Sequence, residues 1–135
     1  MTRYLLDTQA AIWMLTNDNR MPDDIRDELR YMEAQFYISN LTIVEIVHLQ
    51  QCEKIDLPLS GEELISQLQR MGIATIHLDN NILVTLSNLP INRRVHSDPF
   101  DRTIIATAIA RKLTLVSSDG KFEAYRKFKL TLKSI

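Results

Sequence analysis

The sequence has few or none of several residues and patterns that define particular classes of protein. It has one cysteine, Cys52, among 135 residues, so neither an intrachain disulfide framework nor a cysteine-rich zinc site is possible. No apolar run approaches the roughly 20 residues that span a bilayer, and no secretion signal precedes the first strand-like run. These absences predict a cytoplasmic protein without membrane contact.

Glycine and proline are also scarce, with 3 and 4 copies, and the chain contains no repeat, low-complexity tract or linker. Apolar residues make up 45% of the sequence, which is typical of a globular protein. A chain of this length is expected to form a single domain over residues 1–135.

The chain lacks a charge of one sign: 16 basic residues stand against 17 acidic ones, for a net charge of −1. A generic nucleic-acid binder usually has a strong basic excess. If four acids serve as metal ligands, however, 16 basic and 13 acidic residues remain, a net charge of +3. A metal-loaded site could then face a polyanion without repelling it.

The spacing of apolar residues predicts strands that alternate with helices. Strands are expected at 4–7, 36–39, 73–78, 113–117 and 128–132. Helices are expected at 8–15, from Pro22, at 41–52, between the Ser60 cap and Gly72, at 79–89 and at 99–112. This alternation requires crossover connections, and therefore predicts a mainly parallel sheet with helices on both faces.

Two aspartates follow apolar strands directly, at positions where parallel α/β sheets bind ligands. Asp7 ends the first strand, and Asp119 follows the strand at 113–117. Each has an ordinary alternative role: Asp7 as a helix N-cap, and Asp119 in a turn with Gly120. If the two strands are neighbours, both acids reach the same crevice.

Glu45 lies in a nearly all-apolar stretch, and a buried glutamate is rare unless it is paired. It either faces solvent or an arginine, or it points into the crevice toward a metal ion. We expect the surrounding helix to be largely buried, with His48 packed or hydrogen-bonded and Cys52 packed. In the helix at 8–15, Trp13 is expected in the core or at an interface.

The run His96-Ser97-Asp98-Pro99-Phe100-Asp101 places two carboxylates where a helix begins. Asp98 at the N-cap, Pro99 at the first position and Asp101 two residues later would start a helix well without any chemistry. A catalytic role is the equal alternative. Arg102, which follows, suits either a structural ion pair or a phosphate contact.

Together these segments resemble the PIN-domain nucleases, and specifically the VapBC-type toxin branch. The matching pieces cover nearly the whole chain: Tyr4-Leu5-Leu6-Asp7-Thr8, residues 39–45, the Asp98-Pro99-Phe100-Asp101-Arg102 block, and Leu115-Val116-Ser117-Ser118-Asp119. The resemblance implies a three-layer α/β/α sandwich in which strands one and four are adjacent.

The resemblance also assigns site residues. It implies a catalytic and metal-binding cluster of Asp7, Glu45, Asp101 and Asp119, with Asp98 as a further acid that either closes the same pocket or caps the helix. Thr8 and Ser117 match hydroxyl residues near the metal. Gln9 departs from the histidine that this branch often has, which bears on substrate contacts.

The activity that the resemblance implies is a Mg²⁺- or Mn²⁺-dependent endoribonuclease, the toxin of a toxin–antitoxin pair. Oxygen-only ligands suit these hard cations, which activate water for attack on phosphorus. Arg93, Arg94 and Arg102 are candidate contacts to RNA phosphates. The expected partners are a small antitoxin protein and a second copy of the chain in a homodimer.

Three other functions are alternatives to a metal-dependent endoribonuclease. A non-catalytic PIN-like module would bind the antitoxin or RNA without cleaving, although no core acid is missing here. A haloacid-dehalogenase-like phosphatase needs a second aspartate at the position of Gln9. A phosphoacceptor receiver domain needs a further acidic pair and a late lysine that we do not find.

Overall fold

The computed structural model describes residues 1–91 and 98–135. Within these segments one parallel sheet has the strand order β3-β2-β1-β4-β5. Its strands are β1 (Arg3–Leu6), β2 (Gln35–Ser39), β3 (Ile73–Ile76), β4 (Thr114–Ser117) and β5 (Thr131–Ser134). The predicted parallel sheet and the adjacency of strands one and four are both confirmed.

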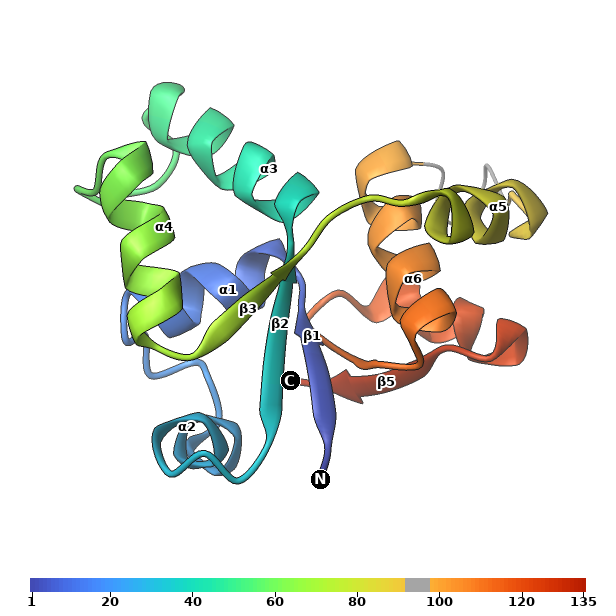
Figure 1. The fold of residues 1–135 in the computed structure, drawn as a ribbon, viewed down its shortest axis with the longest axis horizontal. Coiled ribbons are helices and arrows are strands. Elements are labelled where there is room, and N and C mark those ends of the chain that lie inside the picture. Colours follow the sequence, from blue (N-terminus) through green and yellow to red (C-terminus); the bar gives the residue numbers. More distant parts are fainter. Residues whose placement is uncertain (92–97) are drawn as a thin grey trace.

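Helices cover both faces of the sheet, as predicted (Figure 1). One face packs against α1 (Thr8–Leu15), α2 (Asp23–Arg30), α3 (Asn40–Gln51) and α4 (Gly61–Arg70). The other packs against α5 (Asn80–Asn88), α6 (Pro99–Arg111) and the 3₁₀ helix η1 (Gly120–Phe128). None of the helices in the described segments has the length and apolar character needed to cross a bilayer.

Two cores form because side chains along a strand alternate between the faces of the sheet. Leu6 and Val116 point into the core under α1 to α4, whereas Leu5 and Leu115 point into the core under α5, α6 and η1. All four are fully buried. Burial on both faces explains why these strands read as continuous apolar runs.

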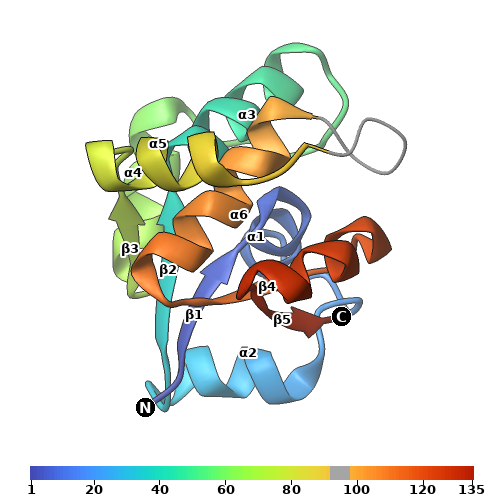
Figure 2. The ribbon, with the colours of Figure 1, turned by 90° about the vertical axis from the view of Figure 1, so that its right-hand side faces the viewer.

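The strand order reverses between β1 and β4. From β1 the chain runs outward through β2 to β3 on one side, and it then returns to β4 and β5 on the other. The connections therefore leave the carboxyl ends of β1 and β4 in opposite directions, which opens a crevice at this edge. Figure 1 shows α1 beginning where β1 ends and α3 beginning where β2 ends, and Figure 2 shows the start of α6 beside α3.

The structure corrects the prediction that the helix around Glu45 is largely buried. Helix α3 is half exposed and not largely buried: only Thr42 and Ile46 are buried, and Val44 is 57% exposed. Cys52 is exposed, so the packing role predicted for it is wrong. His48 is exposed too, but its Nε2 lies 3.7 Å from Cys52 Sγ, so the hydrogen-bonding role is the one of its two predicted roles that the structure supports. The apolar content of this segment did not reveal that α3 extends away from the end of β2, which leaves part of the helix exposed (Figure 1). Trp13 is buried in the core, as expected.

The C-terminal part of the chain also differs from the prediction. The segment at 120–128 is a 3₁₀ helix that the apolar spacing did not predict, and the last strand begins at Thr131 instead of residue 128. A 3₁₀ helix has three residues per turn, so side chains three apart lie in line. Phe122, Tyr125 and Phe128 occupy this spacing and pack into the second core.

The Ser60 cap generates a stability test. The Ser60 hydroxyl accepts the Glu63 N–H, and the Glu63 carboxylate accepts the Ser60 N–H, both at 3.1 Å. We expect Ser60→Ala to lower the free energy of unfolding by about 1 kcal/mol because one helix N–H loses its acceptor. Urea denaturation measures this loss. Glu63→Gln preserves an acceptor and should cost clearly less; an equal loss in both variants would contradict the assignment.

Candidate active site

Asp7 and Asp119 meet at the carboxyl ends of β1 and β4, where the strand order reverses. Asp7 caps α1 by accepting the Ala10 N–H on Oδ1 at 2.8 Å, and Asp119 caps η1 by accepting the Lys121 N–H on Oδ1 at 2.9 Å. The capping role predicted for Asp7 is confirmed, whereas Asp119, for which a turn with Gly120 is the ordinary alternative, caps η1. Each cap uses Oδ1 of its aspartate, so neither cap occupies Oδ2.

Ser117 ties these two aspartates together. Its side chain is fully buried at the end of β4, and its Oγ accepts the Asp119 N–H at 3.0 Å. A hydrogen bond to the same side chain also lowers the pKa of Asp7. One hydroxyl thus contacts both strand-end residues and fixes their relative position.

Glu45 approaches the same place from the first half of α3. The Thr8 hydroxyl, at the start of α1, donates to Glu45 Oε1 at 2.6 Å. Glu45 is half-buried and faces the crevice, in agreement with the functional interpretation of its apolar surroundings. This hydrogen bond links the start of α1 to α3. Thr8, which follows Asp7 in the chain, thereby orients Glu45.

Asp98 and Asp101 have separate roles at the start of α6. Asp98 is the N-cap and accepts the Asp101 N–H on Oδ1 at 3.0 Å, so of its two possible roles the structure supports the capping one. Asp101 is half-buried and faces the crevice. The proline at N1 and the cap explain why the helix begins here.

Of the three candidate phosphate-binding arginines, the structure describes Arg102. Arg102 Nη2 donates to the Leu89 carbonyl at 2.5 Å, which holds the end of α5 against α6. Arg93 and Arg94, together with His96 and Ser97 of the motif, lie outside the described residues.

The four acids line one pocket of about 300 Å³. They come from the ends of β1 and β4, from α3 and from α6. The lining residues are Asp7, Thr8, Gln9, Ile12, Glu45, Leu49, Asp101, Ile104, Ser118, Asp119 and Phe122. Among residues 1–91 and 98–135, no three acidic, histidine or cysteine side chains lie close enough together in this conformation to hold a metal ion.

Asp7 is buried in the wall of the pocket, and this burial changes its pKa. It is 8% exposed, and this burial raises its pKa to about 6; the charges of Asp101 and Asp119 act in the same direction. The hydrogen bonds from Ser117 and the Ala10 N–H oppose the rise. A carboxylate that is costly to ionise in this setting is one that a nearby cation would stabilise.

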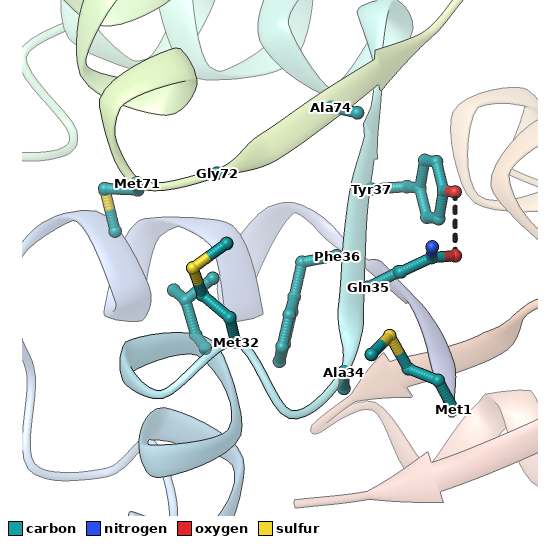
Figure 3. A pocket seen from close by; sticks show the side chains of 10 residues that line it. Met1, Met32, Ala34, Gln35, Phe36, Tyr37, Met71, Gly72 and Ala74 are labelled. Atoms are coloured by element: carbon teal, nitrogen blue, oxygen red, sulfur yellow. Dashed lines mark hydrogen bonds between the residues drawn. The ribbon is translucent and has the colours of Figure 1, made fainter.

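A larger pocket lies at the opposite, amino-terminal end of the strands (Figure 3). It has a volume of about 420 Å³ and is lined by Met1, Leu29, Met32, Ala34, Gln35, Phe36, Tyr37, Met71, Gly72 and Ala74. The side chains in Figure 3 carry no charge, and the polar contact drawn joins the Tyr37 hydroxyl to Gln35 at 3.2 Å. The lining contains no carboxylate, histidine or cysteine, so size alone does not identify the candidate active site.

Sequence reasoning missed the walls of the acidic pocket. Ser118 lines it as well, whereas Ser117, the predicted hydroxyl residue, is buried behind it. Gln9 lies at the pocket, in keeping with the expectation that it bears on substrate contacts. The apolar wall of Ile12, Leu49, Ile104 and Phe122 gave no separate signal, because such residues look like any other core positions.

Comparisons with known proteins agree with this geometry. Residues 4–128 match the family model of the PIN domain. The chain is 26% identical over 128 residues to Ribonuclease VapC22 of Mycobacterium tuberculosis, covering 93% of this chain and 94% of that protein.

Solved structures show the same fold. One is VapBC2 from Rickettsia felis bound to a DNA fragment from its promoter, with a TM-score of 0.68, 21% identity and 98% of each chain covered. Another is VapBC-1 from nontypeable Haemophilus influenzae, with a TM-score of 0.65, 18% identity and 98% of each chain covered.

The raised pKa of Asp7 predicts how stability depends on pH. An acid whose pKa is higher in the folded than in the unfolded chain destabilises the fold once the unfolded form has ionised. In EDTA-treated protein, stability should therefore fall as pH rises from about 4 to about 6 and then level off. Asp7→Asn, which keeps a capping oxygen, should remove this fall and raise the free energy of unfolding at neutral pH by up to about 3 kcal/mol.

Chemical denaturation across this pH range checks the prediction. Asp56→Asn, at an exposed carboxylate outside the pocket, is the matched control and should follow the wild-type curve. An Asp7→Asn curve parallel to the wild-type curve would show that Asp7 ionises normally.

Proposed function

The chain belongs to the PIN domain family, and from this we propose that it is a metal-dependent endoribonuclease, the toxin of a toxin–antitoxin pair. The observation that carries the proposal is the convergence of Asp7, Glu45, Asp101 and Asp119, from four separate elements, on one pocket. Helix capping accounts for the places of Asp7 and Asp119 but not for those of Glu45 and Asp101, whose like charges would otherwise disfavour a shared pocket.

The relatives support the choice of RNA and of an antitoxin. The curated relative is named a ribonuclease, and several similar structures are toxin–antitoxin or VapBC complexes. Between 88% and 98% of the chain aligns with them, so we treat residues 1–135 as one unit of this type.

The donor set of the pocket suits Mg²⁺ or Mn²⁺. Every candidate ligand is an oxygen, which hard cations prefer, and the buried charge of Asp7 has no cation beside it in the pocket lining. We assign Asp7, Glu45, Asp101 and Asp119 as the residues that hold the ion, which would draw these carboxylates together. When bound, such an ion supplies positive charge that activates water and stabilises the reacting phosphate.

The remaining residues position the acids and the RNA. Thr8 orients Glu45, and Ser117 holds Asp7 and Asp119 in register. Gln9, at the pocket, offers an amide for hydrogen bonds to RNA. The apolar wall limits access of water around the reacting groups.

The arginines and Asp98 are assigned outside the chemistry. Arg93 and Arg94 keep their proposed role as phosphate contacts. Arg102 is engaged by the Leu89 carbonyl, so we assign it to holding α5 and α6 together instead of RNA. Asp98 acts as the cap of α6.

Exposed apolar side chains support protein partners. Val44, Ile65, Leu83 and Val84 are all at least 47% exposed, on α3, α4 and α5. Exposed apolar surface of this kind commonly marks an interface, and we assign it to the antitoxin and to a second copy of the chain. A cytoplasmic location, consistent with a single exposed thiol, is part of the same proposal.

One alternative has an observation in its favour. Because the described acids are not yet gathered around a common point, a module that binds an antitoxin or RNA without cleaving is the second candidate. Metal titration separates the two functions, since only the nuclease needs an ion in the pocket.

Cleavage of RNA tests the proposal directly. Purified protein is incubated with a panel of transfer and other structured RNAs, with Mg²⁺, with Mn²⁺ and with EDTA. We expect cuts only with metal, and a loss of at least about 10²-fold in Asp7→Asn because a ligand is removed. Asp56→Asn should cut normally. Full activity in Asp7→Asn would refute the assignment, and metal-independent cuts would refute the cation.

The Thr8–Glu45 hydrogen bond gives a second test. Thr8→Val removes the donor while keeping the shape, and loss of such a supporting contact typically weakens metal binding by about 10- to 100-fold. Isothermal titration with Mn²⁺ measures this directly, without reference to cleavage. Thr8→Ser keeps the hydroxyl and should bind like the wild type. Unchanged affinity in Thr8→Val would mean that Glu45 needs no orientation or holds no metal.

A further inference from the structure

Helix η1 has three faces, because residues three apart in a 3₁₀ helix lie in line. The first face is aromatic: Phe122 and Tyr125 are buried, and Phe128 packs partly against the same core. This aromatic face explains how a 3₁₀ helix of nine residues persists, although runs beyond three or four residues are uncommon. It also fixes which way the other two faces point.

The second face is electrically neutral. Arg126 Nε donates to Glu123 Oε2 at 2.6 Å, and the Ser134 hydroxyl donates to Glu123 Oε1 at 2.9 Å. These contacts hold the pKa of Glu123 below its ordinary value, so it stays charged and paired. The only acid within η1 is thus neutralised by its own arginine.

The third face carries Lys121, Ala124 and Lys127, all exposed. At about 2.0 Å of rise per residue, the two lysines stand about 12 Å apart along the helix. Lys129 follows one residue after η1. We call Lys121, Lys127 and Lys129 the lysine track; among the described residues none of them has an ion-pair partner.

The two ends of the track meet two different pockets. Lys121 lies two residues after Asp119, which lines the acidic pocket and accepts the Lys121 backbone N–H on Oδ1. The other end opens on a pocket of about 470 Å³ between α5, α6 and η1, lined by Thr85, Asn88, Leu89, Pro90, Ile109, Lys127, Phe128 and Lys129. This pocket has two lysines, an amide and a hydroxyl, and no carboxylate in its lining.

The lysines at this second pocket are held in place without being neutralised. Lys127 Nζ lies 5.3 Å from the centre of the Phe128 ring. A cation–π contact of this kind restrains the ammonium group but consumes none of its hydrogen-bond donors. Lys129 occupies a left-handed backbone conformation, with φ of 72°, at the end of η1. Both ammonium groups therefore remain available to an anion.

We propose that the lysine track binds successive backbone phosphates of the RNA substrate and leads the strand from the pocket at Lys127 and Lys129 to the acidic pocket. This inference rests on the proposed nuclease function. The physical need is clear: four carboxylates repel a polyanion, and a chain with a net charge of −1 has no general attraction for RNA. A row of unpaired lysines beside the acids supplies that attraction locally.

The geometry favours RNA over an acidic protein segment. The track is linear and begins at the pocket where the phosphate would react, which is the arrangement that a single strand passing through an active site requires. An acidic segment of a partner protein would have no reason to be aligned with the four carboxylates.

The test measures RNA binding without cleavage. Fluorescence anisotropy follows a labelled oligouridine and, separately, a labelled oligoglutamate, with EDTA-treated protein carrying Asp7→Asn. Into this background we introduce the pair Lys127→Gln and Lys129→Gln. The control pair, Arg30→Gln and Lys54→Gln, removes the same charge at exposed residues without a described ion pair elsewhere on the surface.

Each lost phosphate contact reduces the slope of log K against log salt by roughly 0.7 for a single strand. We therefore expect the lysine pair to flatten the slope by about 1.4 and to weaken oligouridine binding by at least about tenfold at 0.1 M salt. The control pair should leave the slope unchanged. Equal effects of the two pairs would overturn the proposal, because only net charge would then matter.

Two further outcomes are decisive. If the lysine pair weakens oligoglutamate binding and leaves oligouridine binding intact, the track belongs to an acidic protein partner and the proposal fails. If wild-type protein does not cleave RNA but the lysine pair loses RNA affinity as expected, the nuclease assignment fails while the binding surface stands. The two hypotheses are thus tested by separate readouts.

Discussion

The parallel pairing of β1 with β4 is the contact on which the rest of this molecule depends. It joins two halves of the chain that pack their helices on opposite faces of the sheet. Because the connections leave these two strands in opposite directions, a crevice opens at their carboxyl ends. Asp7 and Asp119 occupy that crevice only because the strands beneath them are neighbours, and the buried charge of Asp7 is the energetic consequence.

The residues of the site serve the fold and the proposed chemistry together. Asp7 and Asp119 cap the helices that follow their strands, and Ser117 holds both through one hydroxyl. The Thr8 hydroxyl likewise orients Glu45 through a hydrogen bond. The hydrogen bonds fix how these acids lie, while the charges of Asp101 and Asp119 make Asp7 harder to ionise. The larger apolar pocket at the other end of the strands shows none of these features.

On the side of the molecule formed by α6 and η1, the acids of the pocket and the unpaired lysines lie in separate places. The acids gather at the start of α6 and η1, and the unpaired lysines continue along η1. A net charge close to zero hides this separation, which explains why composition argued against nucleic acid while local geometry argues for it. The three-residue period of η1 produces the separation, since it sorts aromatic, paired and unpaired residues onto different faces.

The sequence by itself determined the local structure: the alternation of strands and helices, the caps at Asp7, Ser60 and Asp98, and the acids at strand ends, because these depend on neighbours a few residues away. Other features needed the tertiary structure. The β1–β4 adjacency followed from family resemblance and not from any local pattern. The exposure of α3, the 3₁₀ form of η1 and the Thr8–Glu45 contact depend on surfaces that meet only after folding. Local propensity decides what each segment is, whereas packing between distant segments decides which side chains share a pocket.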